Sequence, residues 1–594
     1  MIDIFSPKFT YLREFLPAQG LSVNHSASAS TIDSGLGLFP IRMSTFIVAL
    51  FVSTLCLFKL LTIGKRDKNY PPGPPTVPVL GNLHLFPTKK AYIRLTEWSR
   101  IYSDIYSLMI GSGVMVVISS YHAVKELLDK QGNLTGDRPQ TTIGDTVTGG
   151  LHMAQAHDGD PNLALLRKTV RTMLTVQKCA EHLPIQRAEA IQFMYDILKD
   201  PTNYHNHAER YTYSVISSVT YGIRAPSEVG DGTNDNASPS NSYKQRFYHV
   251  THLWSLLMEP GRHPPIDLLP SIPFKFIFKH LIPETWPGGR WRKEAREVKR
   301  LHREFYFELL ERVEKRLENG KGIGAFMEQV VIDSQKSLKE GGNGMSRDLM
   351  AYLGGVLLEG GSDTTACYLK TLQLAFTAFP DALKKAQEEM DRIVGNDRIP
   401  EPKDIEELPY IRAIIKETQR WRPPAPTSLP HAATSDAHYK GYVVPQGSTI
   451  LLNMWAICHD EALYEDPERF WPDRYIKSEF GTREGVDVSA FRHTLHFGSG
   501  RRICPGLNLA NNSIEINTML LVWAFDFGKA VDPITKRPIE VDIDDFAEGL
   551  FIAPNPFPCN MRPRSPQHAM LIEQALQDSA ETFETFETDL TWGN

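Results

Sequence analysis

The sequence predicts one large, mainly α-helical domain with minor β sheets, preceded by a single transmembrane helix. Three observations lead to this fold class. Apolar residues recur with helical periodicity over most of the chain, as in the Lys-, Arg- and Glu-rich stretch 292–317. The β-rich runs are short and early, as in residues 104–119, where glycines mark a hairpin. An apolar stretch at residues 43–63 is long enough to cross a bilayer as a helix.

The composition is that of a folded globular protein. Of 594 residues, 42% are hydrophobic and 23% are charged, so the chain can bury a large core. No long Gly/Ser-rich or Pro-rich linker divides residues 76–560, which we therefore interpret as a single domain. The six cysteines are scattered without a C-x-x-C pair, which favours a reducing compartment over a disulfide framework.

The charge distribution argues against nucleic-acid binding. The formal net charge is −6, and the six acidic residues that follow Arg564, with no Lys or Arg among them, account for it. The rest of the chain is therefore neutral and carries no Lys/Arg run, so we expect no nucleic-acid partner. Residues 561–594 are interpreted as an acidic, solvated and poorly ordered tail.

The apolar stretch 43–63 is interpreted as a membrane anchor. It contains one charge, Lys59, and lacks the small-residue cleavage site of a removable signal peptide. One basic residue, Arg42, precedes it, whereas three follow it closely: Lys65, Arg66 and Lys68. The positive-inside rule then places the main domain in the cytoplasm. A buried core helix is the alternative interpretation.

The segments that flank this anchor have simple predicted roles. Residues 64–75 combine the basic residues with PPGPP, which cannot continue a helix and should form a stiff, extended hinge. Residues 1–42 are polar, and Met43 is a candidate alternative start. Residues 1–42 are therefore either lumenal, with Asn24 available for glycosylation, or not translated.

The segment that carries the chemistry is FGSGRRICPG, residues 497–506, followed by a predicted helix from Leu507 to about Phe527. Cys504 lies between glycines just before that helix, so backbone N–H groups and the helix N-terminus should favour its thiolate. Zinc is disfavoured because no second Cys or His lies two to four residues away. An inert cysteine in a Gly-rich turn is the alternative.

Two further patterns admit ordinary explanations. Residues 353–365, LGGVLLEGGSDTT, have helical spacing but contain four glycines, each costing about 1 kcal/mol in a helix. Such a helix needs close approach to a flat group or a local distortion; a packing seam or a loop is the alternative. Glu417 and Arg420 lie three apart on a helix that must end before Pro423, and such pairs usually sit in solvent.

FGSGRRICPG resembles the haem-binding loop F-x-x-G-x-R-x-C-x-G of the cytochrome P450 superfamily at every fixed position. The resemblance implies the fold of that family and makes Cys504 the axial ligand of the haem iron. It also implies that Phe497 packs under the haem, that Arg502 meets a propionate, and that Gly500 and Gly506 permit the close turn.

The remaining family motifs follow in order along residues 70–560. GGSDTT, residues 360–365, resembles the oxygen-binding groove, which implies that Asp363 and Thr364 relay protons on the distal side of the haem. Glu417 and Arg420 match E-x-x-R. A PERF segment supplies Arg469 as the third member of a buried network that holds the haem loop.

Two propionate contacts are weaker matches. Residues 163–167 stand where the family often has W-x-x-x-R, and leucine replaces the tryptophan. Arg167 remains a candidate propionate ligand, with Arg171 as a competitor one turn later. His431, in SLPHAA, is a candidate donor as well, weighed against an ordinary surface histidine.

The resemblance implies a microsomal, fungal-type haem monooxygenase with haem b as its cofactor. It would insert one oxygen atom from O₂ into a hydrophobic small molecule, by hydroxylation or epoxidation, in fungal secondary metabolism. No flavin or nicotinamide fingerprint is present, so NADPH would act through NADPH-cytochrome P450 reductase, with cytochrome b5 as a second electron donor and Arg501 as a docking point. The location implied is the endoplasmic reticulum membrane, single-pass, with the catalytic domain in the cytoplasm.

Four segments are expected to line the substrate pocket: residues 141–153, 357–361, 425–429 and the turn at Leu550 and Phe551. They are apolar or small, which indicates a hydrophobic ligand. Two other functions remain open, an oxygen-independent rearranging or dehydrating enzyme and a non-catalytic haem-binding protein. Asp363 and Thr364 favour the monooxygenase, because rearranging members tend to lack both.

Overall fold

The computed structural model describes residues 39–227, 229, 242–259, 262–263, 266–268, 276–286 and 288–588. The chain divides into two units, Met1–Lys59 and Leu60–Asn594. The predictions for residues 1–38, including the Asn24 glycan, lie outside the described residues.

The described part of the first unit, residues 39–59, belongs to helix α1, Phe39–Thr62. Its large apolar side chains are exposed wherever they are described, among them Phe46, Phe51 and Phe58. Within the described ranges, no helix has a stretch that is both long and apolar enough to cross a membrane.

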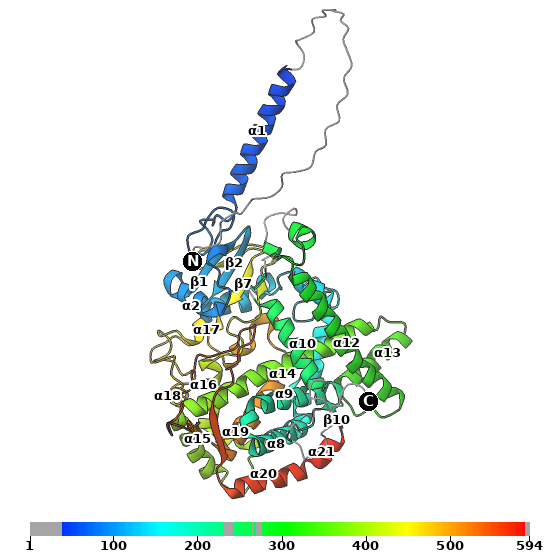
Figure 1. Cartoon of the computed structure of the whole chain (residues 1–594), viewed down its shortest axis with the longest axis vertical. Helices are drawn as coiled ribbons and strands as arrows, with labels where there is room; N and C mark the ends of the chain where they lie inside the picture. Colours follow the sequence, from blue (N-terminus) through cyan, green and yellow to red (C-terminus); the bar gives the residue numbers. More distant parts are fainter. Residues whose placement is uncertain are drawn as a thin grey trace, which may run out of the picture. The chain divides into compact units, whose positions relative to one another are not determined.

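The second unit, here called the body, is mainly helical with small sheets (Figure 1), as predicted. Its first helices are α2 (Ala91–Tyr102), α3 (Tyr121–Val124), α4 (Gly132–Thr135), α5 (Thr142–Thr148), α6 (Leu163–Met173), α7 (Val176–Glu181), α8 (Leu183–Lys199), α9 (Tyr204–Tyr221) and α10 (Tyr243–Met258). Those that follow are α12 (Trp291–Glu318), α13 (Phe326–Lys339), α14 (Arg347–Ala378), α15 (Pro380–Ile393), α16 (Pro409–Trp421), α17 (Met454–Cys458), α18 (Asp473–Lys477), α19 (Leu507–Ala524), α20 (Pro566–Asp578) and α21 (Ala580–Glu584).

The largest sheet has four strands in the order β1-β2-β7-β4, namely Ile105–Ile110, Gly113–Ile118, Thr449–Leu452 and His431–Ala432. The predicted hairpin at residues 104–119 is confirmed, because β1 and β2 pair antiparallel with Ile105 opposite Ile118. The other described strands form three pairs: β5 (Ala437–Tyr439) with β6 (Tyr442–Val444), β8 (Phe525–Lys529) with β9 (Cys559–Pro563), and β10 (Glu587–Thr588) with β3 (Ile223–Arg224).

Helix α14 is the central element of the body (Figure 1) and packs against α9, α12 and α19. It starts where the Ser346 hydroxyl accepts a hydrogen bond from the Leu349 N–H at 3.2 Å, and it ends before Pro380, which disfavours helical geometry in the preceding residue. Most of its side chains are buried. The helix that carries Asp363 and Thr364 is therefore held by neighbours on several sides.

The predicted hinge is folded onto the body rather than extended away from it. The Arg66 guanidinium donates to the carbonyls of Gly73, Pro74 and Ser107, each at 2.9 Å. Gly73 lies so close to β1 that a Cβ there would be 2.2 Å from the Ser107 carbonyl oxygen. Because a single arginine satisfies three backbone carbonyls, the Pro-rich segment is a docked strap, and the extended-spacer prediction is wrong for it.

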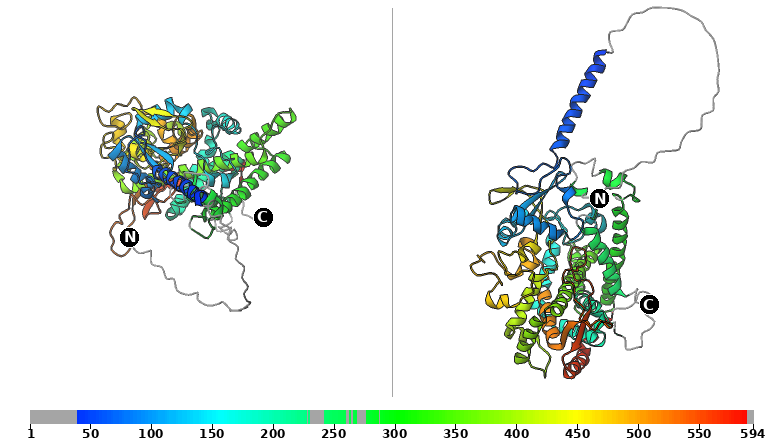
Figure 2. Two further views of the ribbon diagram at one scale, coloured as in Figure 1. Left: turned by 90° about the horizontal axis from the view of Figure 1, so that it is seen from above. Right: turned by 60° about the vertical axis from the view of Figure 1, so that its left-hand side comes forward.

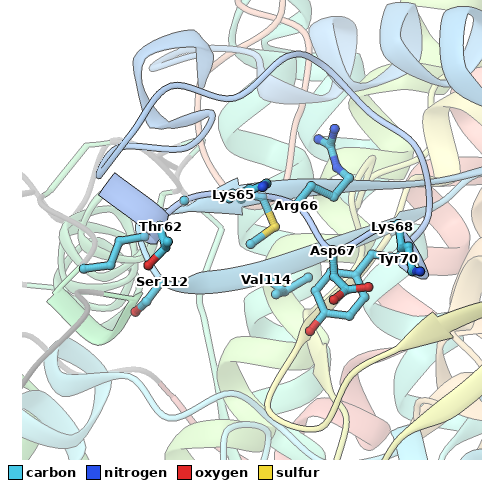
Figure 3. Close-up of a pocket in the computed structure, with 11 residues that line it drawn as sticks. Thr62, Lys65, Arg66, Asp67, Lys68, Tyr70, Ser112 and Val114 are labelled. Atoms are coloured by element: carbon cyan, nitrogen blue, oxygen red, sulfur yellow. The ribbon is translucent and has the colours of Figure 1, made fainter. Parts of the chain in front are cut away.

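A cavity of about 660 Å³ lies between this strap and the β1–β2 hairpin (Figure 3). Its lining comes from the end of α1 and the start of the strap, namely Thr62, Ile63, Gly64, Lys65, Arg66, Asp67, Lys68 and Tyr70, and from the hairpin, namely Met109, Ser112 and Val114. Three of these side chains are basic and one is acidic, so the cavity carries net positive charge.

The predicted poorly ordered tail is wrong for residues 561–588. Strand β9 pairs with β8, and β10 adds to β3 in parallel. Helix α20 packs on α8 at the end of the body opposite the β1–β2 hairpin (Figures 1 and 2), and its Ile572 is fully buried. The prediction rested on the number of acidic residues and overlooked apolar residues at helical spacing. These residues pack against the core and are Leu571, Ile572, Ala575 and Leu576.

Candidate functional site

The loop that carries Cys504 is shaped by backbone contacts. The Cys504 N–H donates to the Phe497 carbonyl at 2.8 Å, which closes the loop just before α19. Gly500 has φ +59°, and a Cβ there would lie 2.1 Å from the Leu128 carbonyl oxygen, so only glycine fits. Gly506 precedes α19 with φ −89°, and a Cβ there would lie 3.8 Å from the Cys504 sulfur. Gly506 therefore keeps the side of the sulfur bare and is not required by backbone conformation.

An anchor for this loop was missed by the sequence reasoning. The Asp129 carboxylate accepts hydrogen bonds from the Gly500 N–H at 3.0 Å and the Ser499 hydroxyl at 2.6 Å. Arg492 bridges the same two groups, pairing with Asp129 and donating to Ser499 at 2.6 Å. Asp129 lies more than 350 residues before the loop, so no local sequence signal could reveal the contact.

The environment of Cys504 does not by itself favour a thiolate. Burial raises the pKa of the thiol, and the Gly506 N–H and the Arg167 charge oppose that rise without cancelling it. The Gly506 N–H favours the thiolate, as predicted, but burial outweighs this contribution to the pKa. A metal cation coordinated to the sulfur would supply the missing positive charge, because metal ligation deprotonates a thiol.

Basic side chains from four separate segments gather beside the Cys504 loop. Buried Arg502 donates to the Gly136 carbonyl at 2.9 Å and to the Asp158 carboxylate at 2.8 Å. Arg167 donates to the Arg501 carbonyl at 2.7 Å. Its competitor Arg171 is exposed, which leaves Arg167 as the better placed of the two.

The cationic groups of this cluster perturb one another. Burial and the charges of Arg502 and Arg167 lower the pKa of Arg138 to about 9. Burial, Arg171 and Arg502 lower the pKa of Arg167 to about 10. Burial, Arg138 and Arg502 lower the pKa of His431 to about 3. The cluster therefore holds more positive charge than Asp137 and Asp158 offset.

The same cluster contains buried donors that the protein leaves unused. The donors Arg138 Nε and Arg502 Nη1 and the ring nitrogen His431 Nδ1 are buried and have no hydrogen-bond partner among the described residues. Buried polar groups are rarely left unsatisfied, and the two carboxylates of a haem would provide both the acceptors and the negative charge. These residues fit a haem whose propionates point at the cluster. Arg138 was missed from the sequence, although DRP directly before the predicted pocket segment 141–153 was a usable signal.

Three of the four glycines of α14 serve packing. A Cβ at Gly354 would lie 2.3 Å from the Tyr221 hydroxyl, at Gly355 2.5 Å from the Tyr306 ring, and at Gly361 2.6 Å from Ile216. These three make the packing seam that was the alternative interpretation, and the helix stays regular through all four. A Cβ at Gly360 would meet nothing within 4 Å, so only this glycine faces open space.

Thr364 and Asp363 stand beside that open face. The Thr364 hydroxyl donates to the Gly360 carbonyl at 3.0 Å, across the open turn. Burial raises the pKa of Asp363 to about 6, with Lys370 opposing the rise and Glu209 and Glu359 adding to it. A carboxyl that titrates near neutral pH can accept and release protons, as a proton relay requires.

The predicted Glu417–Arg420 pair is present and fully buried. Arg420 Nε and Nη2 bind the two Glu417 carboxylate oxygens, each at 2.8 Å. Arg420 Nη1 also donates to the carbonyls of Cys458 at 2.8 Å and Pro467 at 2.9 Å. The pair thus joins α16 to the chain segment that precedes α18.

The third member of this network is Arg474, and the assignment of Arg469 is wrong. Arg474 Nε lies 3.2 Å from Glu417 Oε1, and its side chain is buried. The Arg469 side chain is exposed, and only its carbonyl accepts a bond from Arg420. The sequence repeats the pattern, PERF at 467–470 and PDRY at 472–475, and the second copy supplies the buried arginine.

The four segments predicted to line the substrate pocket lie close to one another two by two. Pro426 and Thr427 face Leu550 across a small cavity of about 30 Å³. His152, from segment 141–153, binds Glu359, from segment 357–361. Phe497, placed by resemblance beneath the haem, is partly exposed and bonds through its carbonyl to Cys504.

The sequence of this chain is similar to those of known proteins. The sequence model of the family described as Cytochrome P450 matches residues 71–541. A cytochrome P450 monooxygenase of Armillaria gallica is 36% identical over 530 residues, covering 89% of this chain and 96% of the relative. One from Arthrobotrys oligospora is 36% identical over 561 residues, covering 92% and 100%. The monooxygenase fogE of Aspergillus ruber is 36% identical over 545 residues, covering 90% and 94%.

Proposed function

This chain belongs to the cytochrome P450 family and is a haem monooxygenase, and from that premise we propose its cofactor, electron donor, substrate class and location. The cofactor proposed is haem b, with Cys504 as the iron ligand. Arg138, Arg167, Arg502 and His431 would hold the propionates. The observation that carries this proposal is the set of buried, unpaired donors beside the Cys504 loop.

Once bound, the haem supplies the oxygen-activating chemistry, and the chain supplies orientation and proton delivery. Asp363 would take up a proton at its carboxylate and pass it on, since its raised pKa lets it do so near neutral pH. The Thr364 hydroxyl would orient toward the open turn at Gly360, where it already donates to the carbonyl. These two side chains support dioxygen use over an oxygen-independent rearrangement.

The substrate proposed is a hydrophobic small molecule, hydroxylated or epoxidised in fungal secondary metabolism. Support comes from the apolar and small residues of the pocket segments and from the fungal monooxygenases that resemble the chain. Electrons would come from NADPH-cytochrome P450 reductase, with cytochrome b5 as a second donor. Arg501, whose side chain is 59% exposed beside the Cys504 loop, is the proposed docking residue.

We further propose that residues 43–63 anchor the chain in the endoplasmic reticulum membrane with the body in the cytoplasm. The apolar side chains exposed on α1 and the basic residues at the cavity that follows it support this placement (Figure 3). After carbonate extraction of yeast microsomes, the full chain should stay with the membrane and a chain starting at Gly64 should not. Release of the full chain by carbonate would contradict the anchor.

The replacement Thr364→Ala tests the proposed chemistry. A monooxygenase should lose most of its product and divert its reducing equivalents to hydrogen peroxide, whereas a rearranging enzyme or a haem carrier should be unaffected. The measurement is peroxide formed per NADPH consumed in the reconstituted system. Thr377→Ala is the matched control, because Thr377 on the same helix also donates to the carbonyl four residues earlier, at 2.8 Å, far from Gly360.

A further inference from the structure

A buried hydrogen bond joins His152 to Glu359, the residue of α14 directly before the open turn. Glu359 Oε2 is 3.0 Å from His152 Nε2, and the two side chains are only 12% and 7% exposed. The Tyr306 hydroxyl of α12 donates to the other Glu359 oxygen. The next residue is Gly360, the one glycine of this helix that faces open space. The pair therefore stands at the edge of the proposed oxygen-binding groove.

The contact with His152 affects the pKa of the Glu359 carboxyl. Burial alone would raise the pKa of Glu359, but the charge and hydrogen bond of His152, the charge of His302 and the bond from Tyr306 outweigh burial and lower it. His302 is 3.8 Å from the carboxylate, too far for a hydrogen bond, and burial lowers its own pKa to about 4. His152 is thus the side chain of residues 149–162 that hydrogen-bonds to the Glu359 carboxylate.

His152 belongs to a segment without regular structure, residues 149–162, between α5 and α6. Near its other end this segment binds the Cys504 loop, since Arg502 donates to the Ala156 carbonyl at 2.9 Å and to Asp158 at 2.8 Å. The segment is therefore tied to α14 at one point and to the Cys504 loop at another.

The start of the segment is built to pivot. Gly149 and Gly150 have φ +64° and +78°, and a Cβ at either would meet nothing within 4 Å. Beyond these two glycines, the segment is held by the His152–Glu359 bond, by the burial of Met153 and Ala156, and by the bonds from Arg502.

From these contacts we infer that Glu359 is a positioning residue: by binding His152, it holds residues 149–162 as the side wall of the substrate space and thereby controls which molecules reach the haem. The inference rests on the proposed haem at Cys504, but not on the proposed substrate or membrane anchor. Removing the tie should free the wall, widen entry and leave the Cys504 loop intact.

Azole binding tests this without knowledge of the substrate. The association rates of imidazole and of the bulkier 4-phenylimidazole are measured by stopped flow at the Soret band of the purified holoenzyme. His152→Ala should speed 4-phenylimidazole at least about fivefold and imidazole far less. His152→Gln, which can still donate to Glu359, should restore the wild-type rates. The control His122→Ala removes a similar contact, 3.1 Å from Asp487, with both side chains exposed, and should change neither rate.

Equal 4-phenylimidazole rates in wild type and in folded, haem-loaded His152→Ala would overturn the inference. If that variant does not take up haem, hydrogen exchange of Glu359→Ala, which removes the acceptor, decides. Faster exchange confined to residues 149–162 is expected, and exchange equal to wild type there would overturn the inference. Failure of the haem assignment would show separately, in the carbon monoxide spectrum of the wild-type chain.

Discussion

At the scale of single residues, Asp363 links protonation to stability. Burial, with Glu209 and Glu359, raises its pKa to about 6 against the opposing charge of Lys370, whereas in an unfolded chain the carboxyl titrates near about 4. The folded state therefore binds the proton more tightly. The ionised form costs stability as the pH rises from about 4 to about 6, and the cost stays constant above that range.

Asp363→Asn should remove this cost. The variant should match wild type at about pH 4 and exceed it above pH 6, by up to roughly 3 kcal/mol. The free energy of unfolding from chemical denaturation at pH 5 and at pH 7.5 measures the difference. The control is Asp348→Asn on α14, which removes an exposed pair with Arg303 of α12. Its effect on the free energy of unfolding should be nearly the same at both pH values. A stability difference that is the same at both pH values would contradict the account.

The network around Glu417 can also be tested by replacing single residues. Arg474→Ala leaves a buried carboxylate with one partner fewer, so it should cost about 3–5 kcal/mol and lower the yield of haem-loaded protein. Arg469→Ala, at an exposed side chain five residues earlier, should change stability by no more than about 0.5 kcal/mol. Unfolding curves and the haem-to-protein ratio of the two variants compare them. The reverse order of effects would restore the original assignment.

At the scale of elements, helix α20 is the clearest test of the fold. Ile572 is fully buried, whereas Met570 on the same helix is 57% exposed. Ile572→Ala should therefore destabilise the chain by about 2–5 kcal/mol, and Met570→Ala should have little effect. Thermal unfolding of both variants gives the comparison. Equal melting temperatures would mean that the residues after 561 do not pack as described.

The elements also show what sequence can and cannot predict. The hairpin of residues 104–119 and the helix at 292–317 were predictable because their apolar periodicity is local. The helix predicted from Leu507 to about Phe527 ends at Ala524, since the next residues pair in β8 with β9. The docking of Pro-rich residues 64–75 depends on Arg66 reaching β1, a tertiary contact that no local pattern encodes.

At the scale of the whole molecule, the family fold was predictable because its motifs are fixed and ordered along the chain. The residues proposed to hold the haem were only partly predictable from the sequence. Cys504, Arg502, Arg167 and His431 were named from motifs, but Arg138 and Asp129 join them only through folding. Spacing alone cannot tell that the arginine of PDRY, and not that of PERF, is buried. The sequence named Cys504 as the candidate ligand, whereas the charges and contacts around it required the fold.

The central claim is that Cys504 is the axial ligand of a haem iron, and the spectrum of the reduced, carbon monoxide-bound protein tests it most directly. The purified wild-type chain should show the red-shifted Soret band of a thiolate-ligated haem. Cys504→His should lose that band, while Cys559→Ser, at another free cysteine, should keep it. A histidine-type spectrum from wild type, or a thiolate band that survives in Cys504→His, would contradict the claim.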